Sequence, residues 1–278
     1  MSVNLVRRGL ALAFTALLAI GSAHAEDGVR ADVHREAVDA TQYPWSAIGK
    51  LYNETGGACT AVIISRDKVL TAAHCIFNYR TQRFIPAASL HFLAGYHVGH
   101  YAAHARVAAY TIGQGFDALN YDATSSADWA ILTLTEMLPA GVEPLKLMPG
   151  FSPSGAKAVI AGYPEDRAFA MTADSDCEVR DTIDGGKLFL HTCRGINGYS
   201  GAPILVGAAD NKIEVAGIQI ATFQSDGTQK VLAVPAHTIA QAMRDEERGS
   251  PGLIAGEASG LYAINNMAGS DISSVAFG

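Results

Sequence analysis

Three short segments of the chain hold side chains that could carry out nucleophilic chemistry. The segment Leu70–Cys75 ends a strand-like run in a turn of small residues, and this turn carries His74. Asp128 opens a second apolar run, and Ser200 lies in the glycine-flanked segment Gly198–Pro203. A serine hydroxyl is a poor nucleophile until a base takes its proton, and an imidazole oriented by a carboxylate is suited to that task. The three residue types together therefore favour acyl transfer.

In the order histidine, aspartate, serine, the three segments resemble the trypsin/chymotrypsin superfamily of serine proteases, over roughly residues 43–246. Further similar segments begin at Tyr43, Leu93 and Gly162. The short loops make the bacterial trypsin-like and glutamyl-endopeptidase-like branch the nearest. The resemblance implies a double β-barrel that hydrolyses peptide bonds, with the site between the barrels.

The resemblance also implies a role for each residue of the site. His74 would take the proton of Ser200 and pass it to the leaving amine, while Asp128 holds the tautomer of the imidazole and stabilises the imidazolium. The backbone N–H groups of Gly198 and Ser200 would form the oxyanion hole. A side chain at position 198 would restrict that turn and crowd the substrate.

Four cysteines form an even set, as expected for disulfides in an oxidising compartment, and on paper they allow three pairings. The resemblance pairs Cys59 with Cys75, which would close the loop that carries the histidine. Cys177 and Cys193 would then cross-link two strands that lead toward the nucleophile. A zinc site is disfavoured because the spacings lack the close pairs that zinc favours.

An α/β-hydrolase is the competing interpretation of the serine motif. Its chain order would be Ser200, then Asp210 or Asp226, then His237. Ala202 interrupts the usual G-x-S-x-G elbow, and strands do not alternate with helices. This interpretation also leaves the histidine segment unexplained, so we disfavour it.

The residue before the nucleophile departs from the family pattern. An aspartate is usual there, and in zymogens it pairs with the amine that cleavage releases, but this chain has Tyr199. Insertion of a new N-terminus would therefore lack its carboxylate partner. Cleavage near Arg30 or Arg35 would trim a propeptide, and we do not expect it to switch on the site.

The specificity pocket leaves two interpretations open. Arg194, six residues before the serine, stands where the family often has the pocket floor, and the segment 217–222 would form the wall. No acid stands at the floor, which disfavours a trypsin-like preference, and an arginine would pair with an acidic substrate side chain. Against this, similar glutamyl endopeptidases have histidine where Gln219 stands. Arg194 would otherwise point to solvent beside a small apolar pocket. Ile220 and Thr222 would offer backbone to an extended substrate.

Four histidines lie within fourteen residues, at His91, His97, His100 and His104. Imidazoles at such spacing can bind zinc or copper. The resemblance makes this segment two strands and a turn, in which alternation sends neighbouring side chains to opposite faces. We therefore expect no metal site here.

The elements that position these residues read as short strands rich in β-branched and aromatic residues between turn signals. A strand-like character begins at Tyr43–Gly49, and only Ala236–Glu246 reads as a helix. Two sets of about six short strands predict an all-β fold of two antiparallel barrels or sandwiches, with a short C-terminal helix. The resemblance implies two antiparallel six-stranded barrels, over 41–145 and 146–247. The other expected strands are Thr60–Ser65, Val69–Ala73, Leu90–Ala94, Arg106–Ile112, Ala130–Leu134, Ala158–Gly162, Cys177–Arg180, Lys187–Thr192, Ala202–Val206, Ile213–Ala221 and Val231–Val234.

Both ends of the chain read as segments outside the barrels. Residues 1–25 combine Arg7 and Arg8, a short apolar run and an Ala-x-Ala end, which predicts a signal peptide. The apolar run is too short for a membrane anchor, and the twin-arginine export signal is matched poorly. Residues 26–40 read as a propeptide or N-terminal arm, and the Gly-, Ala- and Ser-rich residues 248–278 as a flexible tail.

Composition agrees with an exported globular protein. The chain of 278 residues is 49% hydrophobic and 17% charged, and signal removal would lower the net charge from −7 to −9. This charge argues against nucleic-acid binding. We expect a secreted or periplasmic monomer that acts on protein or peptide substrates without a cofactor or metal and without membrane contact after signal removal. The contrasting hypothesis is a catalytically inactive, protease-like binding protein, misformed around Tyr199.

Overall fold

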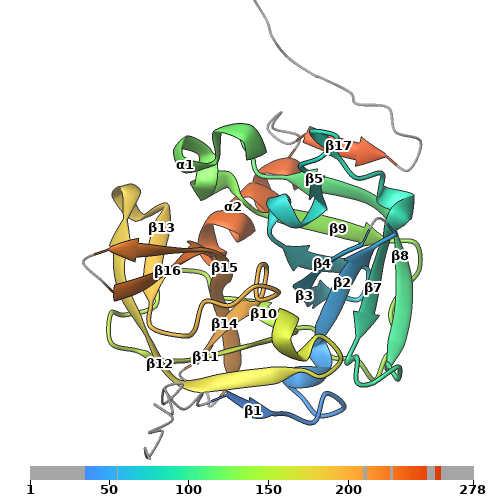
Figure 1. Ribbon diagram of the computed structural model, residues 1–278, viewed down its shortest axis with the longest axis horizontal. Coiled ribbons are helices and arrows are strands. Elements are labelled where there is room, and N and C mark those ends of the chain that lie inside the picture. The colour runs from blue at the N-terminus through green and yellow to red at the C-terminus, as the bar shows by residue number, and fades with distance from the viewer. Residues whose placement is uncertain (1–34, 55, 209–211, 226–227, 249–253, 258–278) are drawn as a thin grey trace, which may run out of the picture. The chain divides into compact units, whose positions relative to one another are not determined.

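The computed structural model describes residues 35–54, 56–208, 212–225, 228–248 and 254–257. The predicted signal peptide and most of the predicted tail lie outside these residues. The described elements form two closed β-barrels, with the first barrel's strands on the right of Figure 1 and the second's on the left.

The first barrel is a closed ring of six antiparallel strands. It is closed because β8 pairs with both β7 and β9. Consecutive residues of these strands, such as Val62 and Ile63 or Val69 and Leu70, are fully buried, so the β-branched and apolar runs that predicted the strands also fill the core. The strands, in ring order, are β8 (Ala103–Ile112), β7 (Leu90–Ala94), β2 (Ile48–Asn53), β3 (Gly57–Ser65), β4 (Lys68–Thr71) and β9 (Ala130–Leu134).

The second barrel has the same construction, and the pairing of β12 with β13 closes it. A two-residue strand, β10 (Lys146–Leu147), adds to β15 in parallel. The predicted class of two antiparallel six-stranded barrels is confirmed. The strands in ring order are β12 (Thr172–Ile183), β11 (Lys157–Gly162), β14 (Pro203–Gly207), β15 (Ile213–Ser225), β16 (Thr228–Pro235) and β13 (Leu188–His191).

Helices are short and few among the described residues. The predicted C-terminal helix is present as α2 (Ala236–Glu247), which buries Ile239. One turn of helix that the sequence did not suggest, α1 (Tyr121–Thr124), precedes β9. Within the described residues, no helix combines the length and apolar character that a membrane span requires. The remaining elements are η1 (Trp45–Ala47), η2 (Ala73–Ile76), η3 (Ala87–Ser89), η4 (Ala118–Asn120), η5 (Ser125–Ala127), η6 (Glu165–Arg167), η7 (Asp184–Gly186), β5 (Phe77–Asn78) and β6 (Arg83–Phe84).

Both end segments join a barrel, and each joins the barrel farther from it in sequence. The arm strand β1 (Arg35–Ala37) pairs with β12, on the stretch of that strand that β13 leaves uncovered. The strand β17 (Ile254–Glu257) pairs with β8, on the stretch that β7 leaves uncovered (Figure 1). Ile254–Glu257 belongs to residues 248–278, for which a flexible tail stays a prediction. A long strand with a free edge supplies backbone partners to a segment whose own sequence gives no strand signal.

Candidate active site

Strand pairing in the first barrel brings the predicted base and acid together. Because Thr71 of β4 pairs with Ala130 of β9, the turn after β4 and the residues before β9 meet at one end of the barrel. His74 Nδ1 lies 2.6 Å from Asp128 Oδ2, and the His74 backbone N–H donates to Asp128 Oδ1 at 2.9 Å. The Asp128 side chain is fully buried. This is the arrangement in which a carboxylate fixes the tautomer and orientation of an imidazole.

Tyr121 is a third partner of Asp128, and sequence analysis did not find it. Its hydroxyl donates to Asp128 Oδ2 at 2.7 Å and lies 3.2 Å from the backbone oxygen of Ile220. Burial, with the nearby negative charge of Asp128, raises the pKa of Tyr121 well above its usual value, so the hydroxyl stays protonated as a donor. Tyr121 belongs to α1, a helical turn that the sequence did not predict, and no motif marks it as a partner of Asp128.

The predicted nucleophile, Ser200, lies in a turn between β13 and β14 that two glycines make possible. Gly198 and Gly201 have φ angles of +93° and +77°, in the region that side chains rarely adopt. A Cβ on Gly198 would collide with the backbone oxygen of Tyr163, and one on Gly201 would collide with Thr71. The glycines are therefore required by both conformation and space.

Thr60 connects the first barrel to this turn. The side chain is fully buried on β3. Its backbone N–H donates to the Ser200 oxygen at 3.0 Å, and its hydroxyl donates to the Gly198 oxygen at 2.8 Å. The same hydroxyl accepts a hydrogen bond from the Tyr163 N–H at 3.0 Å. One threonine thus fixes two carbonyl groups of the nucleophile turn. A threonine within a strand run has no pattern that would have predicted this role.

Two backbone N–H groups of the turn remain available. The carbonyl of Asn197 accepts from the Glu165 N–H at 2.7 Å. Since the two groups of a trans peptide point in opposite directions, the Gly198 N–H is turned away from Glu165. Among the described residues, neither this N–H nor that of Ser200 has a hydrogen-bond acceptor in the protein. Both predicted oxyanion-hole donors are therefore unoccupied.

A cavity of about 280 Å³ adjoins these residues and is formed by side chains of both barrels. Three predicted substrate-binding residues, Gln219, Ile220 and Thr222, line it. Gln219 is buried, and its Oε1 has no partner within the described part of the chain. The fourth, Arg194, is not in the lining, and its backbone N–H donates to the buried Asp174 carboxylate at 2.9 Å. The other lining residues are His74, Tyr79, Tyr121, Ile196, Asn197, Ser200 and Ala221, so the lining contains no Asp, Glu, Lys or Arg.

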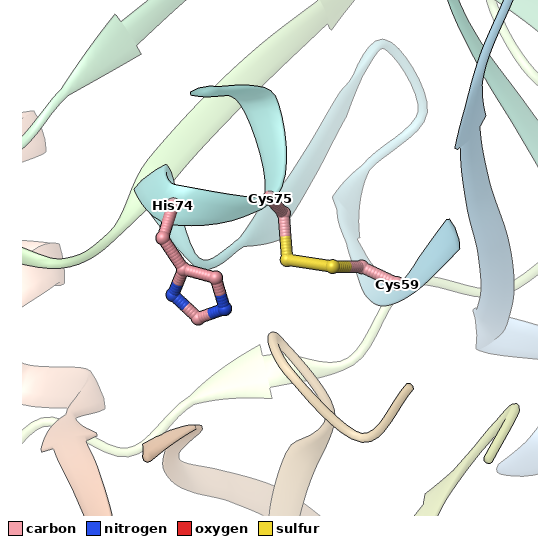
Figure 2. Close-up of side chains that lie close together, drawn as sticks. All are labelled: Cys59, His74 and Cys75. Atoms are coloured by element: carbon pink, nitrogen blue, oxygen red, sulfur yellow. A yellow bond between two sulfur atoms is a disulfide. The ribbon is translucent and has the colours of Figure 1, made fainter. Parts of the chain in front are cut away.

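Both predicted disulfides are present, Cys59–Cys75 and Cys177–Cys193. Figure 2 shows the first beside His74, where it ties the turn that carries the predicted base to β3. Within the described residues, these two cysteines and His74 form the only cluster of three possible metal ligands. Both sulfur atoms of that cluster are consumed by the disulfide, which leaves the histidine alone.

The histidine cluster divides into two pairs. His91 of β7 and His104 of β8 face each other, with 2.9 Å between Nδ1 and Nε2. His97 and His100 close the turn between these strands through backbone hydrogen bonds. The two strands thus bring together only the imidazoles of His91 and His104.

Comparison with known proteins agrees with this geometry. The model of the trypsin family matches residues 33–241. A solved structure of a Glu endopeptidase in complex with MPD superposes with a TM-score of 0.66 at 18% identity, covering 79% of this chain and 98% of that one. No curated protein matches the sequence. The likeness to the Glu endopeptidase shows a shared fold, and the family match covers three quarters of the chain. The chain belongs to the trypsin family of serine proteases.

Proposed function

We propose that this protein is a secreted serine endopeptidase that uses His74, Asp128 and Ser200 as its catalytic triad. One observation carries the proposal: His74 and Ser200 line the same cavity, and Nδ1 of His74 is hydrogen bonded to the fully buried carboxylate of Asp128. A buried, paired aspartate behind a cavity-lining histidine is the arrangement that general-base catalysis needs.

In the acylation step, the Ser200 hydroxyl oxygen attacks the scissile carbonyl carbon and its proton passes to His74 Nε2. The negative charge that forms on the carbonyl oxygen is stabilised by the N–H groups of Gly198 and Ser200, both of which lack a protein acceptor among the described residues. The C–N bond then breaks, the amine leaves with the proton from His74, and the acyl group stays on Ser200. Asp128 stabilises the imidazolium throughout.

Deacylation repeats the same proton transfers with water as the nucleophile. Water attacks the ester carbon while His74 takes its proton, and His74 returns that proton to the Ser200 oxygen as the acid product leaves. Each group of the first step is used again, so no additional residue or cofactor is required.

The cavity supports a preference for uncharged side chains before the scissile bond. Its lining offers no carboxylate for Lys or Arg and no cation for Asp or Glu. Gln219, whose buried Oε1 has no partner among the described residues, offers an acceptor to a polar side chain. The β15 backbone at Ile220 and Thr222 would bind the substrate as an added strand. Arg194, which the sequence suggested as a cation for acidic substrate side chains, is not among the residues that line the cavity.

Export is part of the proposal. Residues 1–25 have the composition of a signal peptide, and two disulfides suit an oxidising compartment. We propose that the mature protease works as a secreted or periplasmic monomer on protein and peptide substrates.

Labelling with a fluorophosphonate, followed by mass spectrometry, tests the proposal most directly. We expect one adduct on Ser200 of the wild type, none on Ser200→Ala, and hydrolysis of casein by the wild type alone. His74→Ala should be labelled far more slowly than the wild type. A folded wild type that is not labelled, before or after limited proteolysis, would instead indicate a protease-like binding protein.

A further inference from the structure

The N-terminal arm places a buried cation close to the nucleophile turn. Arg35 is the first residue of β1, and its side chain is only 5% exposed. Arginine is almost never buried to this extent unless it is paired. The arm is held by three residues that pair with Thr172–Asp174 of β12, so it is attached to the second barrel by backbone hydrogen bonds as well as by this side chain.

The guanidinium of Arg35 pairs with one acidic side chain. Two of its nitrogens contact the two carboxylate oxygens of Asp166, at 3.0 and 2.6 Å, a bidentate pair of fixed geometry. This hydrogen bonding holds the pKa of Asp166 below its usual value. The remaining nitrogen, Nε, is buried and has no hydrogen-bond partner among the described residues. Burial raises the pKa of Tyr199, and the hydrogen bond to Thr172 and the positive charge of Arg35 oppose that rise.

Tyr199 is the residue immediately before the nucleophile and is fully buried. Its hydroxyl lies 2.7 Å from Thr172 Oγ1 and 3.1 Å from the Thr172 backbone oxygen. Thr172 is also the β12 residue that pairs with Ala37 of the arm. The arm and Tyr199 therefore bind the same stretch of β12, and a shift of either one moves the anchor of the other.

The same stretch of β12 also binds the segment that precedes the nucleophile turn. Asp174, which pairs with Arg35 across the strands, accepts a hydrogen bond from the Arg194 N–H at 2.9 Å. Residues 194–198 run from this anchor to the oxyanion-hole glycine. Both ends of the nucleophile turn are thus hydrogen bonded to β12, one end through Asp174 and the other through Tyr199. The arm pairs with this part of β12.

We propose that Arg35 is a positioning residue for the oxyanion hole, acting through Tyr199, and that the arm from Arg35 onward is retained in the active protease. The proposal rests on the proposed function. In the family pattern, a carboxylate before the serine pairs with a newly released amine. In this chain a buried guanidinium from an uncleaved arm supports a phenol at that position. Removal of a propeptide must then end before Arg35, because a cut after it would release the support.

Arg35→Met and Arg35→Lys test the proposal, measured in the full exported chain with active-site titration by fluorophosphonate. We expect Arg35→Met to lower kcat about 10- to 100-fold with KM nearly unchanged, since small misplacements of catalytic groups cost that much. Arg35→Lys should recover part of the loss. Arg180→Met is the matched control, because Arg180 also forms an ion pair on β12, with Glu178, but is 52% exposed. This control should keep wild-type kcat.

A double-mutant cycle separates positioning from general destabilisation. If Arg35 acts through Tyr199, Arg35→Met should cost much less in a Tyr199→Phe background than in the wild type. A folded Arg35→Met protein with wild-type kcat, or losses that multiply independently in the cycle, would overturn the proposal.

Should Arg35→Met fail to fold, Asp166→Asn keeps the proposal testable, because Asp166 is 54% exposed and only orients the guanidinium. A fall of about 3- to 10-fold in kcat would support the proposal, and an unchanged kcat would overturn it. All these values are ratios to the wild type. A wild type that is not labelled therefore contradicts the proposed function itself, a result that cannot be confused with an active wild type and indifferent Arg35 variants.

Discussion

The two barrels hold their parts of the site in different ways. In the first barrel, hydrogen bonds to the side chain of Asp128 join it to His74 and Tyr121, all within that barrel. In the second barrel, the nucleophile is held by the backbone of a glycine turn, whose carbonyl groups accept from Thr60 of the other barrel. The proposed base and acid are thus assembled by one barrel, whereas the turn of the proposed nucleophile depends also on Thr60 of the other barrel.

This difference shows which parts of the site keep their geometry through contacts within one barrel and which need contacts from elsewhere. A buried carboxylate with three donors keeps its geometry as long as the first barrel is folded. A turn with two left-handed glycines has little preference of its own, because glycine loses more conformational freedom on folding than any other residue. Its geometry must be imposed by neighbours. Changes to the first barrel should therefore affect proton transfer, and changes to supports of the turn should affect oxyanion stabilisation.

The largest effect is expected from Asp128→Asn, which breaks the network of the first barrel without touching the turn. The amide would hold the wrong tautomer of His74, and kcat should fall by about 10⁴-fold. Steady-state kinetics on a peptide substrate measures this. Asp122→Asn, at an exposed residue of α1, should remain near wild type. A loss below about tenfold would contradict the assignment of Asp128.

Thr60→Val should break the connection between the barrels. It removes the donor to the Gly198 oxygen and leaves the Tyr163 N–H without its acceptor. Unsatisfied buried groups cost about 1–3 kcal/mol each, so kcat should fall on the order of 10- to 100-fold. Thr133→Val is the control, because Thr133 is a partly buried threonine of the same barrel that pairs with Lys68, at the end of β4 away from the turn. Equal kcat losses in the two variants would show that Thr60 has no special role.

A histidine in the core of the second barrel predicts a pH dependence of stability. His191 is buried, and neither ring nitrogen has a partner in the described part of the chain. Burial lowers its pKa to about 3. Above about pH 6.5 the side chain is neutral in both the folded and unfolded states, so it does not make the free energy of unfolding depend on pH. Between about pH 6.5 and 3 only the unfolded chain takes up the proton, so the free energy of unfolding falls as the pH falls.

The expected size is about 1.4 kcal/mol per pH unit, or about 2 kcal/mol between pH 7 and pH 5. His191→Leu should remove this part of the loss, as measured by urea unfolding at the two pH values. His100→Gln, altered at an exposed turn of the first barrel, controls for loss of a histidine elsewhere. If the free energy of unfolding of His191→Leu falls between pH 7 and pH 5 by as much as that of the wild type, the histidine is not buried in its neutral form.

The smallest effect is expected from Tyr121→Phe. This change removes one of three donors to Asp128 and leaves both contacts with His74. A hydrogen bond to a charged group contributes about 1.5 kcal/mol or more, so kcat should fall by about tenfold. Tyr79→Phe is matched to it, since Tyr79 lines the same cavity and is 54% exposed. Identical kcat values for the two variants would show that Tyr121 only fills space.

Several strands could be read from the sequence because the signal is local. Leu90–Ala94 and Ala130–Leu134 have the bounds that their apolar runs predict. The long strand β12 was predicted only over Cys177–Arg180, since Asp174, Asp176 and Asp181 on either side of that run are residues that strands disfavour. Tyr43–Gly49 was expected to begin a strand, but η1 intervenes and the strand begins at Ile48, because the aromatic residues there suit a packed turn equally well.

The supports of the site could not be predicted. Thr60 and Gly198 are 138 residues apart, Arg35 and Asp166 are 131 apart, and Tyr121 and Ile220 are 99 apart. None of these pairs has a motif, because a threonine, an arginine or a tyrosine is ordinary wherever it stands in a strand or loop. Arg194 shows the converse: its spacing to Ser200 suggested a pocket residue, but the cavity is lined by other side chains.

The sequence by itself determined the residue types of the site and their order, the two sets of about six barrel strands and the likeness to the trypsin family, since each depends on short-range patterns of side chains. Tertiary structure decided which groups hold those residues in place. The arm strand on β12, Thr60 beneath the nucleophile turn and Tyr121 against Asp128 are all contacts between distant segments. Only closure of the two barrels brings such segments within hydrogen-bonding distance.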